Sequence, residues 1–258
     1  MPRTHMIIPD TQVKEGVDTS HLEWIGKWAA EKKPDVIVML GDFADMPSLS
    51  TYDVGKKSFE GQRYTKDVDA ARKAMNKLMF PIWQEQARLI ENKKKQWNPR
   101  LILTLGNHEN RINRAIDSDP KLDGLISTTD LGYGESDWEV YPFLEVVIVD
   151  GIAYSHYFTT GVMGRPVTSA RMLTTKKFMS CTMGHVQKTE IDMSSFRADG
   201  TPIISLFAGC CYLHDEDYLG PQGNVVHRQI IMKYEVNNGF YYPHMISLDY
   251  LKKRYVND

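Results

Sequence analysis

Acidic, amide and imidazole side chains follow three apolar segments of the sequence. Asp10-Thr11-Gln12 follows the first segment, Gly41-Asp42-Phe43-Ala44-Asp45 the second, and Gly106-Asn107-His108-Glu109 the third. Carboxylates, amide oxygens and imidazoles are protein ligands for divalent metals. If the segments are parallel strands, the motifs meet at the carboxyl edge of one sheet, where α/β proteins build their sites. A single Gly-Asp is more often a turn, so the predicted site depends on the three motifs together.

Two histidines at further predicted strand ends complete this set of possible ligands. His156 ends Tyr154-Ser155-His156, and His185 stands in Met183-Gly184-His185-Val186-Gln187. A histidine taken alone is more often structural than a ligand. Here the two imidazoles accompany carboxylates and amides, a mixture that suits a borderline divalent metal.

The segments that carry the first three motifs are typical of strands buried on both faces. They cover residues 6–8, 36–40 and 101–105. Between the first two, Ser20-His21-Leu22-Glu23 has the spacing of a capping box, and a helical pattern then runs to Pro34. Between the second and third, residues 68–82 keep a period of three to four, with Pro81 expected to break or kink the helix.

The later half of the sequence has shorter strands joined by turn signals. Asp150-Gly151, Asp199-Gly200 and Asn237-Asn238-Gly239 are typical hairpin turns, the last between segments 230–236 and 240–246. We therefore expect an α/β first half and a mixed, largely antiparallel second sheet, forming a single domain over residues 1–258. The polar segment 44–63 is predicted to be an insertion over the carboxyl edge of the first sheet.

The composition is that of a globular protein without a strong electrostatic preference. The 258 residues include 31 basic and 33 acidic side chains, with a formal net charge of −2. Contact with nucleic acid would therefore need a local basic patch. The sequence has no apolar stretch of membrane-spanning length and no signal-peptide pattern, which predicts a cytoplasmic protein without membrane partners. The three cysteines are predicted to be apolar packing residues.

The motifs in this order resemble those of the calcineurin-like metallophosphoesterase family. Gly-Asn-His-Glu after an apolar strand is the most specific of them, and the resemblance spans about residues 6–187. The chain looks like small family members from bacteria and phages, which would place a phage-encoded protein in the host cytoplasm. The resemblance implies a four-layer α/β/β/α sandwich with two mixed sheets and two divalent metal ions.

By motif position, the resemblance also implies which side chains hold each ion. One site would use Asp10, Gln12, Asp42 and Gln187, and the other Asp42, Asn107, His156 and His185. The family usually has histidine where this chain has Gln12 and Gln187. Because both replacements fall in the same site, we interpret them as a coordinated change of metal preference. Mn²⁺ is the expected ion, and Mg²⁺, Ni²⁺, Fe²⁺ and Zn²⁺ are alternatives.

Three further residues have catalytic roles by the same resemblance. His108 would act on the leaving group as a general acid or stabilise developing charge, and Asp45 would orient it. Arg111 is the first choice for a contact with the substrate phosphate, because guanidinium groups suit phosphate oxygens. Glu109 is expected to support its neighbours without touching an ion. The cluster His214-Asp215-Glu216-Asp217 is interpreted as a solvated loop.

These features predict metal-dependent hydrolysis of phosphoesters by a metal-bound water at a dinuclear centre. A phosphodiesterase or nuclease is favoured over a phosphoprotein phosphatase, because Met46-Pro47 stands where those phosphatases carry Arg-Gly. Single-stranded nucleic acid and nucleotides are the expected substrates. One alternative is a small-nucleotide phosphatase or cyclic phosphodiesterase, which the near-neutral charge favours. Another is a catalytically weakened protein that binds metal and phosphate. Basic residues near the motifs leave open a local groove for a polyanion, and the oligomeric state stays unknown.

Overall fold

The first of two large sheets carries the three predicted motifs at its strand ends. The computed structural model describes residues 2–52, 54–216 and 220–256. The first four strands in the sequence, β1 to β4, run parallel to one another, and a C-terminal hairpin adds two strands beside β1, the first of them antiparallel to it. The sheet order is β13 (Phe240–Ser247), β12 (Gln229–Asn237), β1 (Arg3–Ile8), β2 (Val36–Met39), β3 (Arg100–Thr104) and β4 (Glu139–Tyr141).

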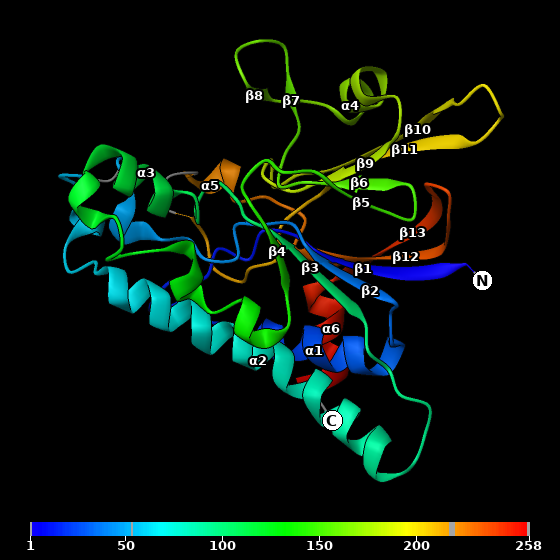
Figure 1. The fold of residues 1–258 in the computed structure, drawn as a ribbon, viewed down its shortest axis with the longest axis horizontal. Coiled ribbons are helices and arrows are strands. Elements are labelled where there is room, and N and C mark those ends of the chain that lie inside the picture. Colours follow the sequence, from blue (N-terminus) through cyan, green and yellow to red (C-terminus); the bar gives the residue numbers. More distant parts are fainter. Residues whose placement is uncertain (1, 53, 217–219, 257–258) are drawn as a thin grey trace.

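Helices α1 (Ser20–Lys32), α2 (Tyr64–Glu91) and α6 (Leu248–Val256) cover the outer face of this sheet (Figure 1). The predicted capping box is wrong, because the N-cap of α1 is Thr19 and its side chain makes no capping hydrogen bond. Instead, the backbone N–H of Ser20 donates to the Asp18 carboxylate at 2.8 Å. The predicted strand, helix, strand units are confirmed.

Helix α2 does not end at its proline. Pro81 lies inside the helix, which continues to Glu91, so a break at this position is wrong. The ring packs on α1 at Gly26, where a Cβ atom would lie 3.1 Å from the proline Cδ and Cγ. This packing between α1 and α2 offsets the backbone hydrogen bond that proline cannot make.

The second sheet is mixed, and two of its four neighbouring pairs are parallel. A mixed sheet was predicted and is confirmed, but the prediction that it is largely antiparallel is wrong, because half of the pairs are parallel. The hairpins at Asp150-Gly151 and Asp199-Gly200 are confirmed within it. The sheet order is β10 (Thr189–Phe196), β11 (Pro202–Ala208), β9 (Ser180–Met183), β6 (Ile152–Tyr154) and β5 (Val147–Val149).

The last hairpin forms as predicted but belongs to the first sheet. Strand β12 pairs with β1, with Ile231 opposite Ile7, instead of extending the second sheet. Strand β1 otherwise has a free edge of backbone groups, and the apolar residues of β12 satisfy that edge while adding to the core. A turn signal predicts a hairpin but does not say which sheet it joins.

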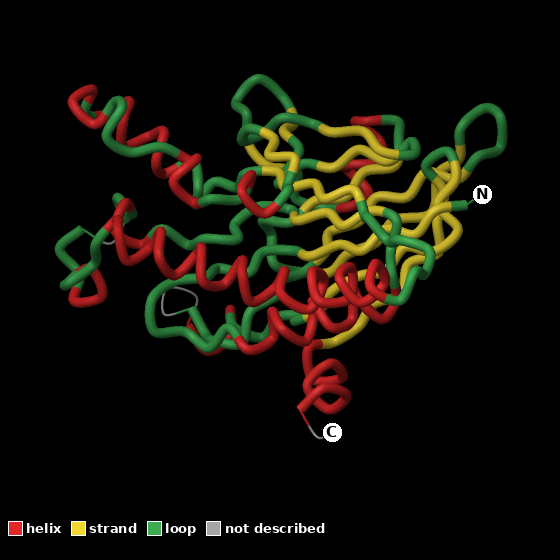
Figure 2. Tube along the Cα trace, turned by 60° about the horizontal axis from the view of Figure 1, so that its bottom comes forward, coloured by secondary structure: helices red, strands yellow, loops and turns green. Residues whose placement is uncertain are grey.

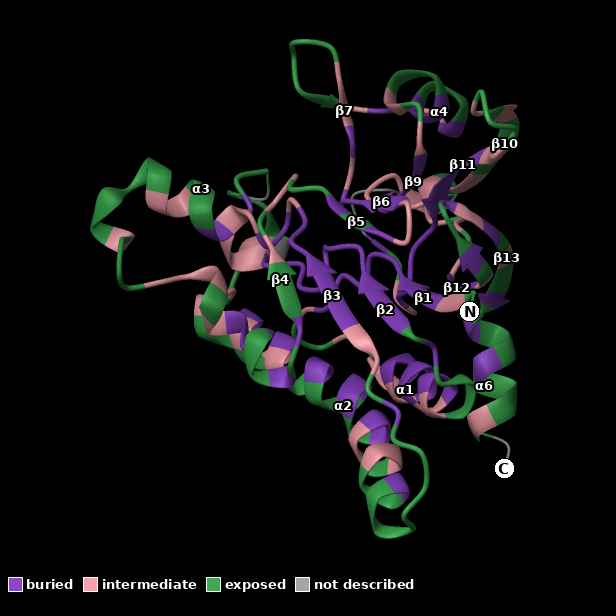
Figure 3. Ribbon diagram, turned by 45° about the vertical axis from the view of Figure 1, so that its right-hand side comes forward, coloured by how far each residue is buried: buried purple, intermediate pink, exposed green. Residues whose placement is uncertain are grey.

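The two sheets face each other and helices cover both outer faces. Helix α4 (Ala170–Lys177) packs against the second sheet, on the side opposite to α1, α2 and α6, so the predicted α/β/β/α order is confirmed (Figure 1). Strands β1, β2 and β3, which carry the motifs, are largely buried (Figure 3). One apolar cluster fills the space between the sheets and includes Ile7, Val38, Ile204, Leu206 and Ile231.

Loops and short elements gather at the end of the sheets away from the N-terminus (Figure 2). The segment 44–63 contains the 3₁₀ turns η1 (Pro47–Leu49) and η2 (Lys57–Phe59). No helix in the described part of the chain is both long and apolar enough to span a membrane. The remaining short elements are α3 (Arg111–Ser118), η3 (Pro120–Leu122), η4 (Thr128–Leu131), η5 (Gly134–Ser136), β7 (Thr159–Thr160), β8 (Arg165–Pro166) and α5 (Gly220–Gly223).

A buried lysine joins the two sheets. Lys233 on β12 is fully buried and donates to the Thr182 hydroxyl on β9 and to the Tyr154 hydroxyl, 3.3 Å away on β6. Its Nζ also lies 4.6 Å and 4.2 Å from the ring centroids of Tyr154 and Tyr241. Burial holds the pKa of Lys233 well below its usual range.

We expect Lys233 to make the stability of the fold depend on pH. Between the lowered pKa of the folded protein and the ordinary lysine pKa of about 10.4, the unfolded lysine binds a proton that the folded one lacks, so the free energy of unfolding rises with pH in that window. One proton corresponds to about 1.4 kcal/mol per pH unit. Urea unfolding at several pH values within that window should show that Lys233→Met lowers this slope by about that amount. The exposed-site control Lys253→Met should leave it unchanged, and equal slopes in wild type and Lys233→Met would contradict the expectation.

Candidate metal centre

The three sequence motifs meet at the carboxyl ends of β1, β2 and β3. The backbone N–H groups of Thr11 and Gln12 donate to the Asp42 carbonyl at 3.1 and 2.9 Å. The backbone N–H of His108 donates to Asp42 Oδ1 at 2.9 Å. Asp42 therefore ties the loops after all three strands together.

Two histidines from the second sheet reach the same point. One ligand atom each from Asp42, His156 and His185 lies within 4.8 Å of the others. The side-chain oxygen of Asn107 stands between the imidazoles, 2.9 Å from His156 Nε2 and 2.8 Å from His185 Nδ1. The structure thus brings together the four side chains predicted for one ion, and their role as ligands stays a prediction.

The hydrogen bonds around His156 show that these residues fit a cation. His156 Nδ1 lies 2.7 Å from the Leu40 carbonyl, which places the ring proton on that nitrogen. A neutral imidazole then directs its Nε2 lone pair at the Asn107 oxygen, with Asp42 Oδ2 only 3.3 Å away. Lone pairs that face each other at such distances need a positive charge between them. A divalent metal meets this requirement, and a proton is the alternative.

The pKa values of the two imidazoles are shifted in opposite directions by burial and by the charges around them. Burial opposes the charged form of His156, but the carboxylate of Asp42 raises its pKa to about 9. Burial and the positive charge of His156 lower the pKa of His185 to about 4. In the protein alone, the centre therefore favours one positive charge and one neutral imidazole.

Asp10 and Gln12 border this centre from the loop after β1. Both Asp10 carboxylate oxygens lie 3.0 Å from the backbone N–H of His185, and burial together with the charge of Asp42 raises the pKa of Asp10 to about 7. Gln12 Nε2 donates to Asp42 Oδ2 at 3.3 Å. Its Oε1 is buried and has no hydrogen-bond partner among the described residues. A buried oxygen without a partner is costly, and a cation would satisfy it.

Gln187 lies differently from the other predicted ligands of this site. Its Oε1 accepts a hydrogen bond from the Tyr212 hydroxyl at 3.0 Å. Within the described chain it makes no hydrogen bond to Asp10, Gln12 or Asp42. Its role as a ligand therefore stays a prediction, and Tyr212 is a neighbour that the sequence did not indicate.

Close backbone approaches explain the glycines of two motifs. A Cβ atom on Gly106 would lie 2.1 Å from Asp42 Oδ1, and one on Gly184 would lie 2.2 Å from Asp10 Oδ1. Each glycine thus leaves room for the carboxylate of another motif. The sequence shows the glycines, but only the fold shows which carboxylate each of them admits.

Several predicted ligands stand on strained backbone. Gln12, Asp42, His185 and Gln187 have φ angles of 47°, 47°, 66° and 58°, in the left-handed region that side chains other than glycine rarely adopt. Such strain costs about 1–3 kcal/mol per residue and clusters at functional sites. The carboxylate of Glu109 helps to hold these loops, because it accepts from the backbone N–H groups of Asp42, Ala44 and Gly106 at 3.0, 2.9 and 2.8 Å.

His108 lies beside the centre and is oriented by Asp45. Its Nδ1 is 2.6 Å from Asp45 Oδ1, while Nε2 lies 3.8 Å from Asp42 Oδ2 and so faces the centre. Burial opposes the charged imidazole, but Asp42 and Asp45 raise the pKa of His108 above its usual range. The geometry suits a group that exchanges a proton at Nε2 while Nδ1 stays held.

Arg111 contacts the Asp45 loop. Its Nη1 donates to the carbonyls of Asp45 and Met46 at 2.7 and 3.3 Å and lies 3.4 Å from Asp45 Oδ1. A contact of Arg111 with substrate would have to use the rest of the guanidinium and stays a prediction. The other basic residues near the motifs are spread over several elements: Arg114 on α3, Arg165 on β8, Arg171, Lys176 and Lys177 on α4, and Lys188 after β9.

Besides Tyr212, two further residues at this site, Lys14 and Glu216, were not predicted from the sequence. Lys14 donates to Asp45 Oδ2 at 3.0 Å and to both oxygens of Glu216 at 2.7 and 2.9 Å. The Glu216 side chain is only 3% exposed, so a solvated loop is wrong for this residue. Asp215 is 72% exposed, as expected, and Asp217 lies outside the described residues. Proximity of Lys14 to the first motif was a usable signal, whereas Glu216 had none.

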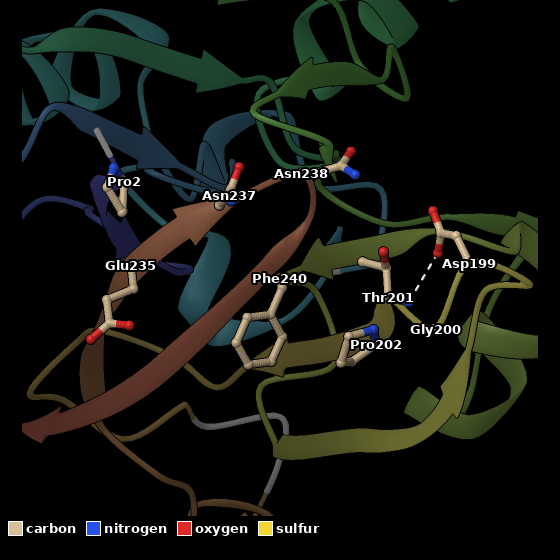
Figure 4. A pocket seen from close by; sticks show the side chains of 9 residues that line it. All are labelled: Pro2, Asp199, Gly200, Thr201, Pro202, Glu235, Asn237, Asn238 and Phe240. Carbon is tan, nitrogen blue, oxygen red and sulfur yellow. Dashed lines mark hydrogen bonds between the residues drawn. The ribbon is translucent and has the colours of Figure 1, made fainter.

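A hollow of about 440 Å³ lies at the other end of β1, near Pro2 (Figure 4). It is lined by residues of the Asp199-Gly200 turn and of the turn between β12 and β13. The Asp199 carboxylate there accepts a hydrogen bond from the Thr201 backbone N–H at 2.9 Å. No group of possible metal ligands was found at this hollow among the described residues.

Comparisons with known proteins assign no chemistry to this chain. No family model matches the sequence, and no curated protein matches it. The structure is similar to that of a conserved uncharacterized protein, a predicted phosphoesterase, from Streptococcus pneumoniae TIGR4. The alignment covers 96% of this chain and 91% of that chain, with 9% sequence identity and a TM-score of 0.40. This likeness is too low to transfer residue roles.

Asp42→Asn should abolish tight binding of divalent metal. The variant would leave the ion only uncharged donors from this set, namely two imidazoles and two amides, and these cannot offset the positive charge of a divalent metal. Isothermal titration of metal-stripped protein with Mn²⁺ should show at least a hundredfold loss of affinity, which is about 2.7 kcal/mol. The control Asp199→Asn removes an exposed carboxylate at a hairpin turn and should bind as wild type does. Unchanged affinity in Asp42→Asn would exclude Asp42 as a ligand.

The double variant Gln12→His with Gln187→His should change metal preference. An amide carbonyl is a harder and weaker donor than an imidazole, so the added histidines should raise affinity for Zn²⁺ more than for Mn²⁺. Titration of wild type should show one tight and one weak Mn²⁺ ion. Two equally tight ions in wild type, or no gain for Zn²⁺ in the variant, would show that these glutamines are not ligands.

Proposed function

We propose that this chain is a metal-dependent phosphoester hydrolase of the calcineurin-like metallophosphoesterase family. The observation that carries the proposal is the convergence of Asp42, Asn107, His156 and His185 on one point, with the His108–Asp45 pair beside it. The donors come from both sheets, so the fold itself assembles the centre. We propose a single domain in which segment 44–63 lies over this site.

Two metal ions would be held by two sets of residues that share Asp42. Asp42, Asn107, His156 and His185 suit one of them, and Asp10, Gln12, Asp42 and Gln187 are proposed for the other. Bound divalent ions would neutralise charge on the phosphate and activate water as the nucleophile. The oxygen-rich second set favours Mn²⁺ or Mg²⁺ over Zn²⁺.

His108 would act as the general acid that donates a proton to the leaving group. Asp45 holds Nδ1 at 2.6 Å, so the proton for transfer is the one at Nε2, on the side of the centre. Donation from Nε2 to the leaving oxygen avoids the expulsion of an alkoxide. Arg111 steadies the Asp45 loop through its contacts with two carbonyls.

A phosphodiester, and single-stranded nucleic acid in particular, is the proposed substrate class. The residue after Asp45 supports a substrate other than a phosphoprotein, because Met46 is fully buried in the apolar core and offers no cation to a phosphate. A small nucleotide or cyclic diester is the alternative. The cytoplasmic location and the absence of membrane partners stay predictions from the sequence.

The proposal is tested by measuring hydrolysis directly. Metal-stripped protein is supplied separately with Mn²⁺, Mg²⁺, Ni²⁺ or Zn²⁺ and given a monoester, a diester, a cyclic nucleotide, and single- and double-stranded DNA. We expect metal-dependent cleavage of the diester and of single-stranded DNA, lost in Asp42→Asn. Cleavage confined to cyclic or small nucleotides would favour the alternative. If the protein binds metal but hydrolyses none of these substrates, a catalytically weakened binding protein would be favoured and the proposal would be overturned.

His108→Ala should slow hydrolysis while leaving metal content intact. Loss of one acid–base group costs about 10² to 10⁴ in rate. The loss should be smallest for a nitrophenyl ester, whose leaving group scarcely needs a proton. Metal analysis of the variant checks that His108 is not a ligand, and loss of metal would contradict its proposed role.

A further inference from the structure

An ion-pair chain continues beyond His108 and Asp45. Oδ1 of the Asp45 carboxylate lies 2.6 Å from His108 Nδ1, with Arg111 Nη1 a more distant neighbour at 3.4 Å. Oδ2 accepts a hydrogen bond from Lys14 Nζ at 3.0 Å. Lys14 in turn contacts both oxygens of Glu216 at 2.7 and 2.9 Å. The side chains of Asp45, Lys14 and Glu216 are only 9%, 22% and 3% exposed. Water therefore screens these charges little, and their geometry matters.

Glu216 is itself held in place from several directions. His214 Nε2 lies 2.7 Å from Glu216 Oε1. The backbone N–H of Glu216 donates to the Asn224 side chain at 2.8 Å, and Asn224 Nδ2 returns a hydrogen bond to the Glu216 carbonyl at 2.9 Å. These contacts hold Glu216 in place, and Glu216 in turn fixes the position of the long Lys14 side chain.

A carboxylate that holds an imidazole must present one oxygen to it at a fixed angle. With Oδ2 bound by Lys14, the Asp45 carboxylate cannot rotate without losing a charged hydrogen bond. Oδ1 then stays directed at His108 Nδ1, and Nε2 stays directed at the centre. Without Lys14, the carboxylate could rotate and weaken its contact with the imidazole, which would keep the Asp45 carbonyl, 3.0 Å from Nδ1, as its other partner.

We infer that Lys14 and Glu216 are positioning residues for His108. Neither touches the reacting atoms, and both act through the Asp45 carboxylate. This inference rests on the proposed function, because it assigns a purpose to the proton-transfer geometry of that site. It gives the buried Glu216, from a part of the chain about 200 residues distant, a role in proton transfer.

The test uses a double variant, because Lys14→Met alone would leave Glu216 buried without its cation. Lys14→Met with Glu216→Gln removes both charges of the pair, and Asp45 keeps His108 and Arg111 as its charged or titratable neighbours. We expect hydrolysis of a diester with an alkyl leaving group to slow about tenfold, and that of a nitrophenyl diester to slow by less than about twofold. The single variant Lys14→Arg keeps the positive charge and should hydrolyse the alkyl diester at close to the wild-type rate.

A double-mutant cycle separates positioning from a structural role. In a His108→Ala background, the Lys14 and Glu216 changes should cost nothing further, since the group that they position is gone. The matched control is Lys66→Met with Glu15→Gln, an exposed pair 3.0 Å apart near the same loop, which should leave both rates unchanged. Equal losses for both esters, or a further loss without His108, would overturn the inference.

Failure of the proposed function would be recognised separately. If wild type hydrolyses no phosphoester, the proposed function fails, and the positioning is judged from nuclear magnetic resonance of ¹⁵N-histidine-labelled protein. The His108 Nδ1 proton should move or exchange faster in the double variant than in wild type and in the Lys66/Glu15 control. An unchanged resonance would overturn the inference whatever the activity.

Discussion

The site depends on the buried carboxylate of Asp42. It is 2% exposed and has the His108 N–H, the Gln12 amide and the His156 imidazole within 3.3 Å, and its backbone joins the loops after β1 and β3. Burial opposes its charge, but the imidazoles of His108 and His156 hold its pKa below the usual range. A buried charge is tolerated only when it is compensated. The surrounding imidazoles, amides and backbone N–H groups meet that requirement, and a metal would meet it more fully.

The two-sheet architecture explains why the donors converge. The first sheet supplies carboxylates and amides from its parallel strand ends, and the second supplies His156 and His185 after β6 and β9. The His185 backbone is tied to Asp10, and the His156 ring to the Leu40 carbonyl, so each histidine is held by the opposite sheet. A change in how the sheets pack would therefore separate the ligands. The positive φ angles of Asp42 and His185 show that local backbone preference yields to this packing.

Much of this arrangement follows from sequence because short-range patterns govern it. The buried strands, the crossover helices, the hairpins and the motifs at the strand ends are encoded by patterns that are local in the sequence. Long-range choices are not: the hairpin after Gln229 joined β1, and Pro81 stayed within a helix because α1 packs on it. Glu216 was missed for the same reason. An acidic residue among others resembles a solvated loop, and only the fold brings Lys14 to it.

We propose that Asp42, Asn107, His156 and His185 together hold a metal ion. Crystals grown with Mn²⁺ and measured at a wavelength where manganese scatters anomalously test it most directly. We expect an anomalous peak for an ion within bonding distance of His156 Nε2 and His185 Nδ1, and a second, weaker peak beside Asp10 and Gln12. Crystals that contain manganese but show no peak between the two imidazoles would contradict it.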